Sequence, residues 1–310
     1  MKVFDWHCDT ALELYKRGES LFQNSLHVSL DRTAEYEAYA QVMAIWSEYS
    51  LSDEEVWTQF HAIRSMLDCQ LKKTDTAVLC TDSATYRAAI ESGKRALFLS
   101  VEDARLLDAK IWRLRDLWET GVRLLTLTWK GTDGIGGAYD TDAPLTSFGR
   151  RVATEAMRIG MTVDVSHASH AVIDECLALS KRLKKPIVAS HSNAFAECGH
   201  PRNLTDEHAV AVARTGGRIG ISLYPGHLAV DGHATVSDVA RHIRHFAELG
   251  LEKAICLGCD FDGVPTLPDG ITGIESMPAL WNALRAEGFS EAFLSDLFFD
   301  NAERFVLENM

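Results

Sequence analysis

The feature that most constrains the fold is a strand–helix–strand pattern in the middle of the chain, in which both strands end in a histidine. Short apolar runs at residues 161–167 and 186–191 end in His167 and His191. Between them, apolar residues recur at helical spacing over residues 171–179. This order predicts a βαβ unit with parallel strands. Both imidazoles are candidate site residues, because the carboxyl ends of the strands carry the chemistry in parallel α/β folds.

The same alternation extends over the whole chain. Eight strands are predicted, at residues 3–9, 40–46, 95–102, 122–129, 161–167, 186–191, 218–224 and 254–260. Helices are predicted at residues 11–16, 52–72, 83–92, 111–119, 148–159, 171–179, 205–214, 236–249, 277–286 and 290–307. Residues 130–147 are rich in Gly and Asp and are predicted to form a long functional loop. We therefore predict one (β/α)8 barrel domain over residues 1–310, with a doubly wound open sheet as the alternative.

Composition restricts the class of partner and the compartment. The formal net charge of −13 argues against a nucleic acid or an anionic membrane surface as the main partner. No run approaches the length of a membrane span, and the first residues show neither a charged leader nor an apolar segment. Of the seven cysteines, only Cys256 and Cys259 have CxxC spacing, and no second pair completes a zinc site. We expect a cytoplasmic protein with reduced thiols.

The ends of five predicted strands carry three imidazoles and three carboxylates. They are His7, Asp9, Glu102, His167, His191 and Asp260. His7 and Asp9 share a face, because alternate residues of a strand point the same way. Singly, each has an ordinary explanation, since Asp9 could cap the next helix and Glu102 could form a buried ion pair. Together they predict a site for two divalent ions of the zinc type, since a single catalytic zinc usually takes three protein ligands.

Several segments of this chain match the motifs of a known family. The most specific are Ser-His-Ser-Asn-Ala at residues 190–194 with Arg-Asn at 202–203, and Asp-Phe-Asp-Gly-Val at residues 260–264. Further matching segments are residues 7–10, 100–102, 125–128, 145–149 and 164–169. In this order they resemble the renal (membrane) dipeptidase family, the M19 metallopeptidases. The resemblance runs from residue 3 to near the end of the chain.

The resemblance implies a barrel that holds two zinc ions. By position, His7 and Asp9 would bind one ion, His167 and His191 would bind the other, and Glu102 would bridge them.

It also implies residues that act on the substrate. Asp260 would shuttle a proton between the attacking water and the leaving amine. Arg202 would hold the substrate by its terminal carboxylate, a role that suits a planar guanidinium. Tyr224, at the end of a predicted strand, is a candidate for the pocket wall.

Trp129 departs from the mammalian members, which carry a His directly after the Leu-Thr-Leu-Thr segment. That His is thought to polarise the substrate carbonyl, whereas an indole has one N–H donor and no titratable nitrogen. Either Trp129 donates this one bond to the substrate, or another group such as His227 or a donor from the loop replaces it, or the reaction differs. The Asp-Ala sequence after Glu102 also differs from the family's Gly-rich form. Both departures bear on substrate specificity more than on the metal site.

The predicted activity is hydrolysis of a dipeptide by a hydroxide that bridges two zinc ions. The resemblance adds that bacterial-type members often accept a D-residue at the C-terminal position, and it suggests a homodimer. Two alternatives stay open at this point. The barrel could hydrolyse an N-acyl amino acid or a cyclic amide, or it could bind a metal or metabolite without catalysis.

Overall fold

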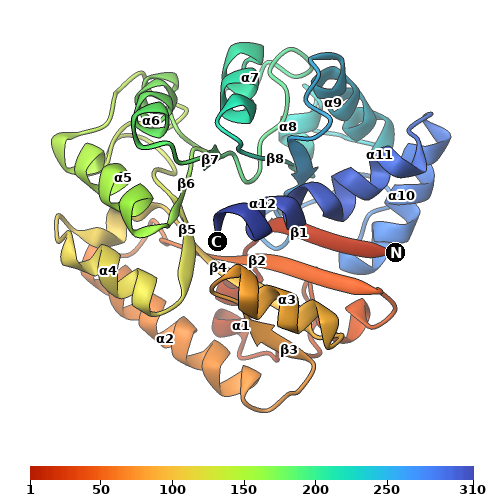
Figure 1. The fold of residues 1–310 in the computed structure, drawn as a ribbon, viewed down its shortest axis with the longest axis horizontal. Coiled ribbons are helices and arrows are strands. Elements are labelled where there is room, and N and C mark those ends of the chain that lie inside the picture. Colours follow the sequence, from red (N-terminus) through yellow and green to blue (C-terminus); the bar gives the residue numbers. More distant parts are fainter.

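The computed structural model describes all 310 residues, and its centre is a ring of parallel strands surrounded by helices (Figure 1). The strands are β1 (Lys2–Cys8), β2 (Ala38–Trp46), β4 (Arg95–Glu102), β5 (Val122–Thr126), β6 (Thr162–Asp164), β7 (Ile187–Val188), β8 (Ile219–Ile221) and β9 (Ile255–Leu257). They pair in the order β7-β6-β5-β4-β2-β1-β9-β8. The ring closes between β7 and β8, where Ala189 N donates to Arg218 O at 2.9 Å and Gly220 N donates to Ala189 O at 2.8 Å. The predicted (β/α)8 barrel is confirmed, and the open sheet is excluded by this closure.

Helices follow the strands and pack around the ring. They are α1 (Thr10–Arg17), α2 (Asp53–Leu71), α3 (Ser83–Glu91), α4 (Trp112–Glu119), α5 (Ser147–Ile159), α6 (His170–Leu183), α7 (Asp206–Arg214), α8 (Pro225–Leu228), α9 (Val236–Glu248), α10 (Met277–Ala286), α11 (Glu291–Ser295) and α12 (Asn301–Asn309). Helix α2 begins at a capping box, in which Ser52 and Glu55 satisfy each other's backbone N–H groups. All seven cysteines are free thiols. No helix is both long enough and apolar enough to cross a membrane.

Aromatic side chains fill the amino-terminal end of the barrel. Phe4 stacks on Phe98 with 5.9 Å between the ring centroids, and both belong to an inner cluster of buried residues. The last helical segment crosses this end of the ring (Figure 1), where Phe305 packs edge-on against Trp6 at 5.0 Å and Phe299 lies 6.2 Å from Phe4. Because this end is filled and covered, only the carboxyl end of the barrel is left to hold a site.

An irregularity in β1 brings His7 to the inside of the barrel. Between two successive pairs with β2, the register advances three residues along β1, from Asp5 to Cys8, but only two residues along β2. Strand β1 therefore contains one extra residue. Strict alternation from the inward-facing Trp6 would turn His7 outward, and the extra residue returns it to the inner face. The prediction that His7 and Asp9 share a face does not depend on this irregularity, but their direction does.

The structure differs from the predicted elements in three respects: two elements were not predicted, one predicted helix is divided, and several strands are shorter. A short strand, β3 (Ala77–Leu79), pairs with the first half of β4, and helix α8 follows β8, the seventh barrel strand; neither element was predicted. The predicted helix 290–307 is divided into α11, the π-helical turn η4 (Asp296–Asp300) and α12. Several predicted strands end too late, since β5 and β6 stop at Thr126 and Asp164. The residues beyond these ends turn away from the ladder and carry functional side chains.

Gly220 in β8 is a position where the barrel tolerates no side chain. A Cβ there would lie 1.8 Å from the Ser190 carbonyl oxygen, which belongs to the neighbouring backbone. We expect Gly220→Ala to lower the free energy of unfolding by about 3 kcal/mol, the upper end of the usual cost of overpacking. Gly134→Ala is the control, because a Cβ at Gly134 meets no atom within 4 Å. Urea-induced unfolding measures both, and equal stabilities of the two variants would contradict this explanation.

Candidate active site

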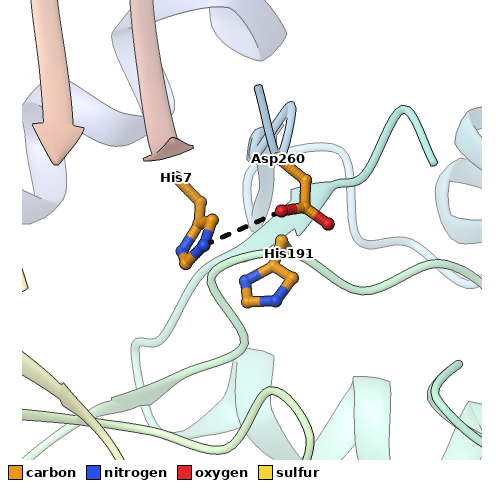
Figure 2. Close-up of side chains that lie close together, drawn as sticks. All are labelled: His7, His191 and Asp260. Carbon is orange, nitrogen blue, oxygen red and sulfur yellow. Dashed lines mark ion pairs between the residues drawn. The ribbon is translucent and has the colours of Figure 1, made fainter. Parts of the chain in front are cut away.

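The carboxyl end of the barrel brings the six predicted strand-end residues into one cluster. His7 and Asp9 lie at the end of β1, and Glu102 is the last residue of β4. His167, His191 and Asp260 lie in the segments that follow β6, β7 and β9. Figure 2 shows His7, at the end of a strand, pointing toward His191 and Asp260, which lie in the segments after two other strands. All six are buried except His167, whose side chain is 12% exposed.

Two of these residues hold strained backbone conformations. His167 has φ 67° and Asp260 has φ 63°, both in the left-handed region that residues other than glycine rarely adopt. Asp262, two residues after Asp260, has φ 66° and accepts hydrogen bonds from His27 N at 2.7 Å and Thr10 Oγ1 at 2.5 Å. Strain of this kind is concentrated at functional sites, where surrounding contacts hold it.

Three carboxylates surround the Nε2 atom of His7. The distances are 3.4 Å to Asp9 Oδ2, 3.4 Å to Glu102 Oε2 and 3.9 Å to Asp260 Oδ1. These spacings are longer than an ordinary hydrogen bond. His7 Nε2 and Asp9 Oδ1 are buried and have no hydrogen-bond partner. Since buried polar atoms are nearly always paired, this arrangement leaves a place for a cation between them.

A second set of ligand atoms meets at the ε-nitrogens of His167 and His191. These nitrogens are 2.9 Å apart, and Glu102 Oε1 lies 2.8 Å from His167 Nε2 and 3.7 Å from His191 Nε2. His167 Nδ1 lies 3.1 Å from the carbonyl oxygen of Trp129. A carbonyl only accepts, so Nδ1 carries the proton and Nε2 presents a lone pair to the cluster.

The imidazoles differ in the direction of their pKa shifts. Burial lowers the pKa of His167 to about 4, and burial with the nearby His7 lowers that of His191. Burial also acts to lower the pKa of His7, but the charges of Glu102 and Asp9 outweigh it and the pKa is raised well above its ordinary value. The carboxylates around His7 therefore attract positive charge, whereas the other two imidazoles favour their neutral form.

The carboxylates respond to burial and to one another. Burial and the charge of Glu102 raise the pKa of Asp9 to about 7, and burial raises that of Asp260 to about 6. Glu102 shifts the other way, because His7 and His167 outweigh the effect of burial and lower its pKa. Glu102 is thus the group in this cluster that most favours its charged form.

The donor atoms fit two divalent ions of the zinc type. In one set of three, His7, Asp9 and Glu102 bring their ligand atoms within 4.8 Å of one another, and Glu102 with His167 and His191 does the same in another. A third set joins His7 and His191 to Asp260. Imidazole nitrogen and carboxylate oxygen are common zinc ligands, and the first two sets share only Glu102. Glu102 is the residue that the sequence analysis expects to bridge two ions.

A cavity of about 360 Å³ lies over the cluster and is lined by Asp9, Glu102, His167 and Asp260. Tyr224, which was predicted for the pocket wall, and Trp129, which was predicted to face the substrate, both line it. Its volume suits a small molecule rather than a folded chain or a nucleic acid.

The cavity contains an aromatic pair, of which only Trp129 was predicted from the sequence. Trp129 packs on Trp46, the last residue of β2, with 4.7 Å between ring centroids, and Tyr49 lies 5.6 Å from Trp129. Tyr139, also missed, comes from the predicted loop, and its N donates to the His167 carbonyl at 2.8 Å. Trp46 could have been found as the end of a predicted strand. Tyr139 carried no signal beyond its place in the loop.

Arg202 lines the cavity as a buried cation. It is 4% exposed, and its Nη2 donates to the His191 carbonyl at 3.3 Å. Its Nε is buried and has no partner, and the ring of Tyr139 lies 5.8 Å from its Cζ. Burial lowers the pKa of Arg202. A buried guanidinium with an unpaired N–H is suited to an anionic group of a ligand.

Comparison with known proteins identifies the family. A family model described as membrane dipeptidase, peptidase family M19, matches residues 1–309. A Klebsiella pneumoniae protein, described as an uncharacterized protein in the pqqA 5′ region, is 31% identical over 244 residues, which cover 75% of this chain and 88% of that protein.

Two solved structures are similar over their whole length. Dipeptidase AC, described as a metallopeptidase of family M19, has a TM-score of 0.91 and 26% identity, covering 100% of this chain and 98% of its own. A Rhodobacter sphaeroides metallopeptidase, solved with a phosphinate mimic of the dipeptide L-Ala-D-Ala, has a TM-score of 0.89 and 25% identity, covering 100% and 99%. This chain therefore belongs to the membrane dipeptidase family, peptidase family M19, a family of metallo-dipeptidases.

Proposed function

We propose that this protein is a binuclear zinc dipeptidase that hydrolyses the amide bond of small dipeptides, including those of the L-Xaa-D-Xaa type. The observation that carries the proposal is the convergence of two ligand sets on the shared carboxylate of Glu102, beneath a cavity that Arg202 also lines. The phosphinate mimic bound by the Rhodobacter sphaeroides relative supports L-Xaa-D-Xaa substrates. A homodimer and a cytoplasmic location are parts of the same proposal.

The residues would divide the two ions between them as the family motif suggests. His7 and Asp9 would hold one ion, His167 and His191 would hold the other, and Glu102 would contact both. When bound, zinc supplies Lewis acidity, which lowers the pKa of water to about 7 and polarises a carbonyl group.

The remaining steps belong to side chains of the chain itself. Asp260 faces the same space as His7 and His191, so its carboxylate would accept the proton of the attacking water and deliver it to the leaving amine. The cavity lining includes both Arg202 and several carboxylates, which suits a substrate that carries a free carboxylate and a free amine. Arg202 would bind the substrate carboxylate and so orient the amide bond.

Arg202→Ala tests the recognition of the carboxylate. We expect KM for free dipeptides to rise roughly 10–100-fold, because a hydrogen bond to a charged group contributes about 1.5–3 kcal/mol. Dipeptide amides, which lack the carboxylate, should show little change. Arg202→Lys is the matched control, since it keeps the charge without the planar fork and should give an intermediate KM. Steady-state kinetics with free dipeptides and with dipeptide amides measures the effect. An equal rise in KM for both substrate types would exclude this role of Arg202.

Trp129 favours one alternative function. Its ring packs on Trp46 and lines the cavity, so it offers less polar character there than a His would. A barrel of the amidohydrolase type acting on an N-acyl amino acid or a cyclic amide would fit this wall. The discriminating experiment compares hydrolysis of L-Ala-D-Ala, L-Ala-L-Ala and N-acetyl-D-Ala by the zinc-loaded protein. Preference for the free dipeptides supports the dipeptidase, and activity on the acetylated compound alone supports the alternative.

A further inference from the structure

We propose that Asp164 and Ser190 are positioning residues that set the tautomer of His191, so that its Nε2 lone pair faces the metal-ligand cluster. The inference rests on the proposed function, because it concerns how the chain prepares the site for an ion. Neither residue contacts the cavity. Both are 1% exposed and lie behind His191, in the segments around the ends of β6 and β7.

The first step is the state of Asp164. Its Oδ1 accepts from Ser166 N at 3.0 Å and from Ser190 N at 2.9 Å. Its Oδ2 is 2.6 Å from Thr126 Oγ1 and 2.6 Å from Ser190 Oγ. Backbone N–H groups can only donate, so Oδ1 carries no proton. Four donors match the four acceptor positions of an ionised carboxylate, and bonds to an ionised group are the stronger kind.

The second step follows from the single proton of a serine hydroxyl. Ser190 Oγ donates that proton to Asp164 Oδ2, so it can only accept from the ring of the next residue. His191 Nδ1 lies 2.8 Å from Ser190 Oγ and must therefore be the donor. A neutral imidazole with its proton on Nδ1 has its lone pair on Nε2, which is the atom 2.9 Å from His167 Nε2.

The backbone of His191 is held as firmly as its ring. Its N donates to Ser166 Oγ at 3.1 Å, and its carbonyl accepts from Arg202 Nη2 at 3.3 Å. The residue is fully buried. Ring orientation and tautomer are thus set by the protein before any ligand arrives, which is what partners behind a metal-binding histidine generally do.

The two imidazoles of this ligand set are positioned by different devices. His167 donates from Nδ1 to the backbone carbonyl of Trp129, which no side-chain substitution removes. His191 depends on a side-chain hydroxyl that is itself oriented by Asp164. A substitution in the relay from Asp164 through Ser190 can therefore alter the hydrogen bonding of His191 without replacing a proposed ligand.

Ser190→Ala is the variant that breaks the relay. It leaves His191 Nδ1 without an acceptor, so the ring can also place its proton on Nε2, the atom that would bind the ion. We expect zinc affinity at the site of His167 and His191 to fall about 10–100-fold, the usual effect of losing a partner behind a metal ligand. The site of His7 and Asp9 should keep its affinity.

Thr126→Val is the matched control. It removes a bond of the same 2.6 Å length to the same Asp164 oxygen, but Thr126 has no hydrogen bond to His191. Competition titration of zinc against a chelator measures the two affinities of each variant. Weakening of one site in Ser190→Ala, with both retained in Thr126→Val, is the expected result. Equal zinc binding in wild type and Ser190→Ala would overturn the inference.

A second readout does not require bound metal. Spectra of the chelated protein labelled with ¹⁵N-histidine report which ring nitrogen carries the proton. We expect His191 to be protonated on Nδ1 in the wild type and to lose this preference in Ser190→Ala. A wild-type His191 protonated on Nε2 would overturn the inference. If the wild type binds no zinc, the proposed function fails, and these spectra still decide the role of Ser190.

Discussion

Asp260→Asn is expected to lower kcat for a dipeptide by about 10²–10⁴-fold while both zinc ions stay bound, as expected for loss of a general acid–base group. The carboxamide has nearly the shape of the carboxylate but cannot accept and return a proton. Asp260 is also the most distant of the three carboxylates from His7 Nε2, at 3.9 Å against 3.4 Å for the other two. Steady-state kinetics together with zinc analysis measures both effects.

The control for this prediction is substitution of a nearby carboxylate, Asp262. Asp262 also lines the cavity, but its oxygens accept hydrogen bonds from His27 N and Thr10 Oγ1. Asp262→Asn should therefore lower kcat by less than about tenfold, far below the range expected for general acid–base catalysis. Near wild-type turnover by Asp260→Asn would refute its assignment as the proton shuttle. Loss of zinc from this variant would instead make Asp260 a ligand, as its set with His7 and His191 allows.

Glu102→Gln is expected to weaken the binding of both ions at once and to lower kcat/KM by more than about 10³-fold, because the site supplies most of the transition-state stabilisation. Its carboxylate is the one group shared by the set of His7 and Asp9 and the set of His167 and His191. A neutral amide presents one acceptor oxygen in place of two. Zinc analysis after gel filtration should find fewer than two ions per chain.

Asp103→Asn is the matched control for this prediction. Asp103 follows Glu102 directly and is fully buried, but its Oδ1 accepts from Arg105 N at 3.1 Å and it belongs to none of the ligand sets. The variant should keep both ions. If Glu102→Gln also kept both with unchanged affinity, the bridging role would be wrong.

The barrel was predictable because its signal is repeated along the chain. Apolar runs and helical patterns alternate eight times, so an error at one element, such as the missed β3, does not change the conclusion. Strand ends were less predictable. Runs that continue to Trp129 and His167 look like strands, but the ladder stops at Thr126 and Asp164, where the backbone turns toward the cavity. His167 in a left-handed conformation leaves no mark in the hydrophobic pattern.

The side chains that lie at strand ends could be predicted from the sequence as site residues. Features of the site that depend on tertiary packing could not. The extra residue in β1 that turns His7 inward has no sequence signal, and neither does the closure of the ring at Ala189. Tyr139 reaches the cavity because its loop is bonded to the His167 carbonyl. The relay behind His191 likewise depends on distances between segments far apart in sequence. Residue identities therefore indicated the chemistry, and tertiary contacts determined its geometry.

A zinc titration of the chelated protein, with hydrolysis of L-Ala-D-Ala followed at each step, tests whether this barrel is a binuclear zinc dipeptidase. We predict no hydrolysis without zinc, and a rate that reaches its maximum at two equivalents per chain, since the five proposed ligands form two sets of three that have Glu102 in common. Full activity in the presence of chelator, or no hydrolysis of any dipeptide with two equivalents bound, would contradict the proposed function.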